Sequence, residues 1–187
     1  MPILHALLKT NGGWVVFVAR LVLGVVLFAH GSRKLFGWFG GPGFANTVKS
    51  LTTHLKLPKA IAILVIFTEF LGGLGLITGF LARIAALGIV VVMVGAIATL
   101  YPNGLFMNWM GDQEGHGIEY HLLAIALALV VIVEGAGAFS VDRAVYGHHA
   151  GNLSESRTIL DYGAHPHLKS SGDSAEVSAA TGARFLG

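Results

Sequence analysis

The sequence predicts an all-α integral membrane protein: a bundle of four transmembrane helices, with an amphipathic helix lying in the interface between the first and second spans. Of its 187 residues, 54% are hydrophobic and only 12% are charged, whereas soluble domains carry about a quarter charged residues. The mean hydropathy is +0.71, and four long apolar runs have aromatic residues at their ends. So few ionisable side chains cannot cover a globule in water, and lipid therefore has to form part of the solvent.

Charge and cysteine content exclude several classes of protein. The formal net charge is only +2, and the basic residues are scattered singly, which argues against a nucleic-acid partner. Cysteine is absent from the sequence. This chain therefore supplies no thiolate nucleophile, disulfide relay, iron–sulfur ligand or Cys-based zinc site.

The first predicted span covers residues 14–36, in which Arg20 is the charge deepest in the apolar run. At 1.5 Å per residue a helix of this length measures about 33 Å, enough to cross a bilayer core. The rival interpretation is a cleaved signal peptide, because Lys9 precedes the apolar run. Arg20 inside that run and the lack of a clear A-x-A site argue against cleavage.

The apolar stretch over residues 60–100 contains only two charges, Glu69 and Arg83. A single helix of that length would measure about 60 Å, twice the hydrocarbon core. We therefore expect two spans, near residues 60–79 and 83–101, joined by a tight hairpin at Gly79.

The fourth predicted span covers residues 119–139. Aromatic residues that favour the membrane–water interface lie at or just outside the ends of the predicted spans; they are Trp14, Trp38, Trp109, Tyr101 and Tyr120. This placement supports the four spans.

The connector over residues 37–59 contains apolar residues spaced by three and four, opposed by lysines. That pattern predicts a short amphipathic helix in the interface; its apolar residues are Phe44, Val48, Leu51 and Leu55, and its lysines are Lys49 and Lys56. The predicted organisation is an N-terminal segment at 1–13, the transmembrane domain at 14–143, and a polar, disordered tail at 144–187 that contains several histidines.

The predicted location is a membrane, which the chain crosses several times. Lysines and arginines are nearly balanced between the two sides. Arg33 and Lys34 are discounted as intramembrane, and the loop over residues 102–117 has neither lysine nor arginine. The positive-inside rule then favours cytoplasmic termini.

Two charges lie deep in the predicted spans. A charge at the bilayer centre costs at least about 2.5 to 3.5 kcal/mol, so it needs a partner or a wet cavity. Counted from the ends of antiparallel spans, Arg20 and Glu69 reach similar depths, and we expect them to form a buried ion pair. Such a pair can serve a function or merely fix the helix register, and the sequence leaves both open.

A polar stripe runs along one face of the first span and includes His30 and Lys34. The fourth span begins at the same membrane face with Glu119 and His121. These four residues are predicted to line one polar pocket that binds a headgroup and exchanges protons. The alternative is that each side chain extends independently to the membrane–water interface and that they form no common pocket. The match to any metal site is weak, and none is assigned.

Three patches together carry a family resemblance: residues 19–41, ARLVLGVVLFAHGSRKLFGWFGG; residues 67–86, FTEFLGGLGLITGFLARIAA; and residues 119–143, EYHLLAIALALVVIVEGAGAFSVDR. In order and spacing the chain resembles DoxX-type membrane proteins. The resemblance implies a four-helix bacterial inner-membrane protein, described as an oxidoreductase or a subunit of one. The related DoxD subunit belongs to a thiosulfate:quinone oxidoreductase, and mycobacterial DoxX proteins are associated with oxidative-stress and thiol-handling partners. The family supplies no catalytic residue to carry over.

The leading functional hypothesis is a membrane subunit of a redox system, in which a quinone or similar lipid-soluble carrier meets the predicted pocket. The sequence has no dinucleotide-binding fingerprint, cysteine ligand or haem motif, so electrons would arrive from a soluble oxidoreductase partner. One alternative is a non-enzymatic scaffold or receptor. Another is a small proton or solute transporter using Arg20 and Glu69, which would require a homo-oligomer. Whether the chain is itself an enzyme stays open.

Overall fold

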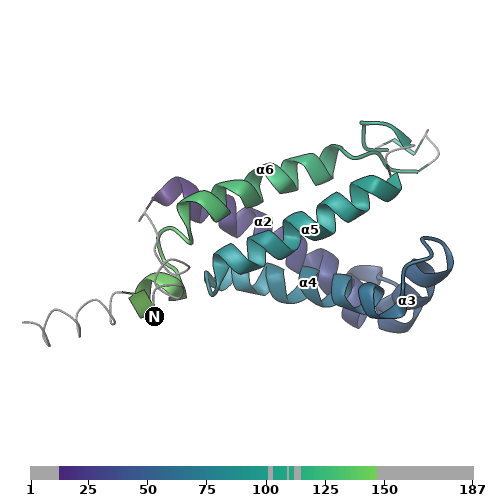
Figure 1. Ribbon diagram of the computed structural model, residues 1–187, viewed down its shortest axis with the longest axis horizontal. Coiled ribbons are helices and arrows are strands. Elements are labelled where there is room, and N and C mark those ends of the chain that lie inside the picture. Colours follow the sequence, from purple (N-terminus) through teal and green to yellow (C-terminus); the bar gives the residue numbers. More distant parts are fainter. Residues whose placement is uncertain (1–12, 101–102, 109, 112–114, 147–187) are drawn as a thin grey trace, which may run out of the picture. The chain divides into compact units, whose positions relative to one another are not determined.

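The computed structural model describes residues 13–100, 103–108, 110–111 and 115–146. Within these residues there is no strand, and the predicted all-α class is confirmed. The elements are α2 (Trp14–Phe36), the 3-10 helix η1 (Trp38–Gly40), α3 (Gly43–Thr53), α4 (Lys59–Thr78), α5 (Ala82–Leu100) and α6 (Glu119–Glu134), shown in Figure 1.

Three helices, α2, α4 and the part of α5 over Ala82–Thr99, are long and apolar enough to cross a membrane. Helix α6 has 16 residues, which makes it about 24 Å long. The prediction that this helix continues to residue 139 was wrong. It ends at Glu134 because Gly135 and Gly137 adopt φ angles of 91° and 71°, which side-chain-bearing residues rarely adopt. That α6 crosses the membrane stays a prediction.

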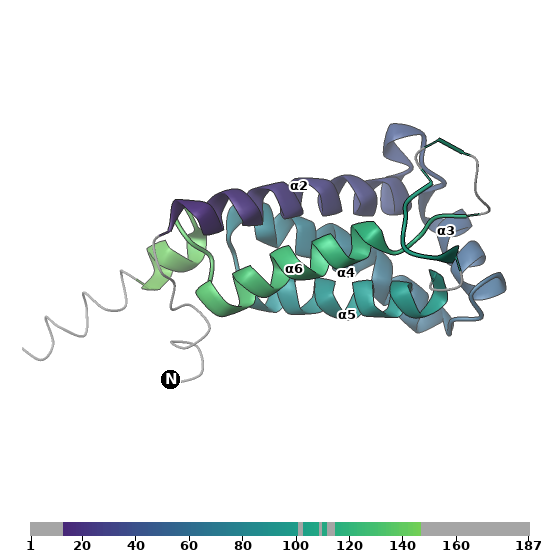
Figure 2. The same ribbon diagram turned by 90° about the horizontal axis from the view of Figure 1, so that it is seen from above.

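The helices associate as two antiparallel pairs. Helix α2 packs mainly against α4, and α5 packs mainly against α6, with further contacts between α4 and α5 and between α2 and α6. Figures 1 and 2 show α4 and α5 close together at their hairpin. In Figure 1 the two helices then diverge toward the end where α3 lies. The two pairs are therefore more widely separated at that end.

Glycines allow the backbones of α2 and α4 to approach closely. A Cβ atom added at Gly31 would lie 2.5 Å from Phe70 Cα, and one added at Gly73 would lie 2.5 Å from Phe28 N. At Gly24, an added Cβ would lie 2.9 Å from Ile77 N. These contacts fix the helix register, in which residue 31 of α2 is level with residues 69 and 70 of α4.

The hairpin between α4 and α5 is held by Asp142, which is 1% exposed. Its carboxylate accepts hydrogen bonds from the backbone N–H groups of Leu81 and Ala82, at 2.7 and 2.9 Å. The backbone N–H of Asp142 in turn donates to Gly79 O at 3.0 Å. The segment that follows α6 therefore closes this end of the structure.

The predicted connector does contain a helix, α3, and part of its apolar face packs against α4. The rings of Phe44 and Phe67 lie 6.4 Å apart. An interfacial position for α3, the inner-membrane location and the orientation of the termini all stay predictions. Residues 144–146 are helical, whereas most of the predicted N-terminal segment and the rest of the tail lie outside the described residues.

We predict that Gly31→Ala lowers the free energy of unfolding by about 1 to 3 kcal/mol, because the added methyl group would overlap the α4 backbone. The matched control is Gly95→Ala in α5, where an added Cβ meets no atom within 4 Å. The control should be neutral or slightly stabilising. Denaturation in mild detergent measures both variants, and a Gly31→Ala variant as stable as the control would contradict the close contact.

Four crossings would place both termini on the same side of the membrane. Reporter fusions after residues 10 and 150 should therefore give the same sidedness. Opposite sidedness would show that an odd number of helices crosses, with α6 as the first candidate for the helix that does not.

Candidate functional site

A cavity of about 820 Å³ is lined by all five longer helices, and its volume is in the range of small-molecule sites. Most of the lining is apolar and comes from α3, α4, α5 and the segment between α3 and α4: Leu51, Leu55, Leu57, Ile61, Leu64, Val65, Ile84, Leu87, Val91, Val92 and Met93. Leu27 of α2 and Met107 add to this apolar wall.

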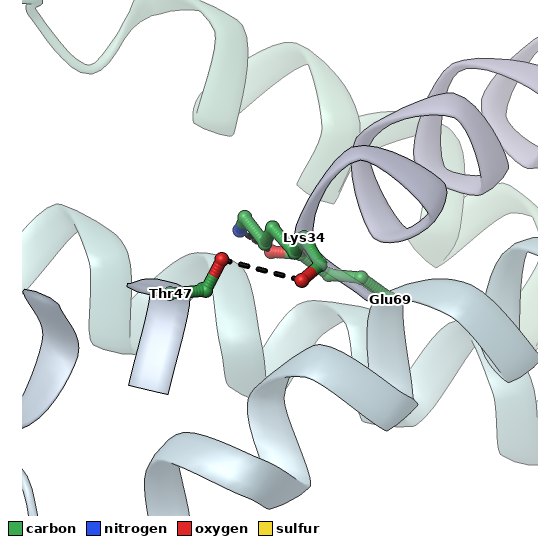
Figure 3. Close-up of polar contacts among 3 residues, drawn as sticks. All are labelled: Lys34, Thr47 and Glu69. Carbon is green, nitrogen blue, oxygen red and sulfur yellow. Dashed lines mark hydrogen bonds and ion pairs between the residues drawn. The ribbon is translucent and has the colours of Figure 1, made fainter. Parts of the chain in front are cut away.

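Thr68, Thr99 and His116 also line the cavity. Five further polar side chains line it, and we call them the polar cluster: His30, Lys34, Glu69, Tyr120 and His121. They come from α2, α4 and α6. Lys34 Nζ and Glu69 Oε1 form an ion pair at 2.6 Å (Figure 3). The ring of Tyr120 stacks on that of His30 at 5.4 Å and meets the ring of His121 edge-on at 5.3 Å. The cluster is therefore continuous across the two helix pairs.

The backbone beside Lys34 is anchored to α3. Thr47 is 5% exposed, and its hydroxyl group donates to Lys34 O at 3.3 Å (Figure 3). The same hydroxyl group lies 2.7 Å from Gly43 O, to which it also donates. Within the ion pair, the side chain of Lys34 is 29% exposed and that of Glu69 is 5% exposed. The lysine can therefore reach solvent, whereas the carboxylate depends on its neighbours.

Three buried polar atoms of the cluster have no hydrogen-bond partner in the described part of the chain: Glu69 Oε2, the Tyr120 hydroxyl oxygen and His121 Nδ1. A buried polar atom without a partner costs about 1 to 3 kcal/mol. Such atoms in a cavity wall are typical of a site that is completed by another molecule.

The structure brings together three of the four residues of the predicted pocket. His30, Lys34 and His121 line the cavity, whereas Glu119 is not among its lining residues and accepts a hydrogen bond from Met107 N at 3.2 Å. The reason is helical geometry, because residues two apart lie about 200° apart around a helix. That the cavity residues bind a ligand stays a prediction.

Sequence reasoning assigned Tyr120 to the interfacial aromatic belt and missed its place in the cluster. The spacing of Tyr120 from the apolar residues of the same helix could have indicated its position. Tyr120 precedes the buried residues Ala124, Ala128 and Val131 by four, eight and eleven positions, and these spacings place all four on one helix face.

The predicted ion pair between Arg20 and Glu69 was wrong. Arg20 is fully buried and donates from Nη1 to the carbonyls of Leu76 and Ile77, at 2.9 Å for Ile77. Its Nη2 atom donates to the carbonyls of Ala138 and Phe139, at 3.4 and 3.2 Å. A guanidinium beside the last carbonyls of a helix is favourable because these groups carry partial negative charge.

Register explains the error. The prediction counted depth from the helix ends and assumed that both helices begin at a membrane face. Glu69 is level with Gly31, which places Arg20 eleven residues, or about 16 Å, farther along the bundle. Lys34 lies within one helical turn of Gly31 and reaches the carboxylate instead.

Comparison with known proteins agrees with the membrane character of this fold. Residues 15–102 match the family model described as DoxX. That DoxX match includes α4, α5 and nearly all of α2, and with them Arg20, Lys34 and Glu69, and it ends before Tyr120.

The chain is also similar to a Bacillus subtilis (strain 168) protein named "Putative oxidoreductase CatD". The two are 27% identical over 136 residues, which cover 72% of this chain and 90% of that protein. No solved structure matches the chain.

We predict that Lys34 and Glu69 are energetically coupled. Removing one partner of a buried pair costs about 3 to 5 kcal/mol, whereas removing both leaves no orphan charge. Lys34→Met should be more damaging than Glu69→Gln, because only the lysine can reach solvent once it is unpaired. The double variant should be more stable than the sum of the single losses implies.

The control is the combination of Arg20→Gln with Glu69→Gln, whose effects on the free energy of unfolding should add because the two side chains do not touch. Denaturation of all variants in the same detergent gives both results. Additivity of the Lys34 and Glu69 substitutions would contradict the coupling.

Proposed function

We propose that this protein is the membrane subunit of a redox system, and that its cavity binds a lipid-soluble electron carrier of the quinone class. The observation that carries the proposal is the combination of the polar cluster with a largely apolar cavity wall. A quinone needs hydrogen-bond donors for its carbonyl oxygens and an apolar slot for its tail.

The polar cluster can supply the donors. An ammonium group has three N–H bonds, and the ion pair with Glu69 uses one of those of Lys34. The Tyr120 hydroxyl and the imidazole N–H groups of His30 and His121 add further donors. These groups surround a headgroup-sized region, while leucine, isoleucine and valine side chains form the rest of the wall.

The same cluster can donate and accept the protons of a quinone reaction. Reduction of a quinone to a quinol consumes two electrons and two protons, and histidine and carboxylate side chains exchange protons readily. The sequence has no recognisable electron-carrier motif. We therefore propose that a soluble oxidoreductase partner supplies the electrons. The name of the similar Bacillus protein, "Putative oxidoreductase CatD", supports a redox role.

The carrier would enter from the lipid between α4 and α5. Ile61 and Leu64 of α4 and Leu87 and Val91 of α5 line the cavity and are also exposed. Both helices are long and apolar enough to lie in a bilayer. An apolar tail would then stay in contact with lipid while the headgroup reaches the polar cluster.

We predict that replacing both His30 and His121 by alanine weakens the binding of a short-tailed benzoquinone by at least about 10-fold, because two hydrogen-bonding groups are lost. Titration of the full chain in lipid nanodiscs measures the dissociation constant. The control is His54→Ala, since His54 caps the end of α3, is exposed and does not line the cavity.

The control should bind as the unaltered protein does. Equal affinity of the double variant and the unaltered protein would contradict the site and would favour a scaffold that holds a partner protein.

A further inference from the structure

We infer that the cavity binds the reduced, hydroxyl-bearing form of its carrier, a quinol, more tightly than the oxidised quinone. This inference rests on the proposed function. The observation behind it concerns two of the three unpartnered atoms in the polar cluster, Glu69 Oε2 and the Tyr120 hydroxyl oxygen.

Glu69 needs a hydrogen-bond donor. Its Oε1 atom is bound to Lys34 Nζ at 2.6 Å, and this ammonium group balances the negative charge of the carboxylate. Its Oε2 atom is buried and has no hydrogen-bond partner among the described residues. An ionised carboxylate only accepts hydrogen bonds. The group that completes Oε2 therefore has to bring an O–H or N–H bond.

Tyr120 can work with either kind of partner. Its hydroxyl group donates one hydrogen bond and accepts others, and its ring is held by stacking on His30. Tyr120 and Glu69 both line the cavity. The two unpartnered atoms therefore belong to side chains of the same cavity wall.

A ligand hydroxyl group can donate to Glu69 Oε2, and it can also accept a hydrogen bond from a donor such as Tyr120. A quinone carbonyl can accept from Tyr120 but cannot donate to Glu69. It leaves Oε2 unpaired and brings a second electron-rich oxygen next to the carboxylate. Hydrogen bonds to charged groups are stronger than those between neutral groups, so the difference favours the quinol.

The test compares the two redox forms of one probe on the full chain in lipid nanodiscs under anaerobic conditions. The probes are a short-tailed benzoquinone and the quinol obtained from it by dithionite reduction. The quinol should bind at least about 10-fold more tightly, as expected for one hydrogen bond to a charged group. Equal affinities, or tighter binding of the quinone, would overturn the inference.

The decisive variant is Glu69→Gln. The glutamine carbonyl still accepts from Lys34, while the amide NH2 replaces the acceptor at Oε2 with a donor. The preference for the quinol should fall to about 1-fold or reverse. The matched control, Glu119→Gln, changes a carboxylate that is not among the cavity-lining residues and should keep the ratio of the unaltered protein.

A second variant covers the case in which Glu69→Gln fails to fold. Tyr120→Phe removes the hydroxyl group but keeps the carboxylate, so the ratio should stay at or above that of the unaltered protein. A lower ratio would show that Tyr120 and not Glu69 sets the preference, which overturns the inference.

The outcomes also separate the inference from the proposed function. Binding of both redox forms with no preference overturns only the inference. Failure of both forms to bind overturns the proposed quinone site, and the inference with it.

Discussion

The close contact between α2 and α4 determines where the charges of this protein lie. Gly24, Gly31 and Gly73 remove the side chains that would hold the two backbones apart. The resulting register brings Arg20 to the carbonyls at the end of α4 and brings Lys34 to Glu69. A shift by one helical turn would leave each of these buried charges without its partners, at a cost of several kcal/mol.

Buried charged side chains have different kinds of partner at the two ends of the described structure. At the hairpin end, Arg20 donates to carbonyls at the end of α4 and in the segment that follows α6. The Asp142 carboxylate accepts from the backbone N–H groups of Leu81 and Ala82 at the start of α5. These hydrogen bonds join helices and loops of the protein to one another. At the α3 end, the helix pairs diverge, and the Lys34–Glu69 pair lies in a cavity wall with unpartnered polar atoms beside it. This end combines charge with space for a ligand.

Much of the fold could be predicted from the sequence, because apolar runs and glycines determine helix positions locally. The helices α2, α4 and α5 begin and end within about one residue of the predicted spans. The register between helices could not be predicted in the same way. It depends on backbone contacts at Gly31 and Gly73, which hydropathy does not reveal. The predicted Arg20–Glu69 pair failed for that reason.

Within the site, a polar stripe on α2 and the start of α6 at the same level placed His30, Lys34 and His121 together, and they do line one cavity. That they bind a ligand stays a prediction. Glu119 was included and Tyr120 was missed, since proximity in sequence was used where helix face was needed. The partners of Arg20 could not be predicted either, because they are backbone carbonyl groups in α4 and in the segment after α6.

The central claim is that a quinone-class carrier occupies the cavity between the two helix pairs, and photolabelling tests it most directly. An azidoquinone would be irradiated with the full chain in lipid nanodiscs, and the labelled residues would be identified by mass spectrometry. The account predicts labels on the cavity-lining parts of α4, α5 and the start of α6, suppressed by excess unlabelled quinone. Labels confined to the outer, lipid-facing side chains, or labels that excess quinone does not suppress, would contradict it.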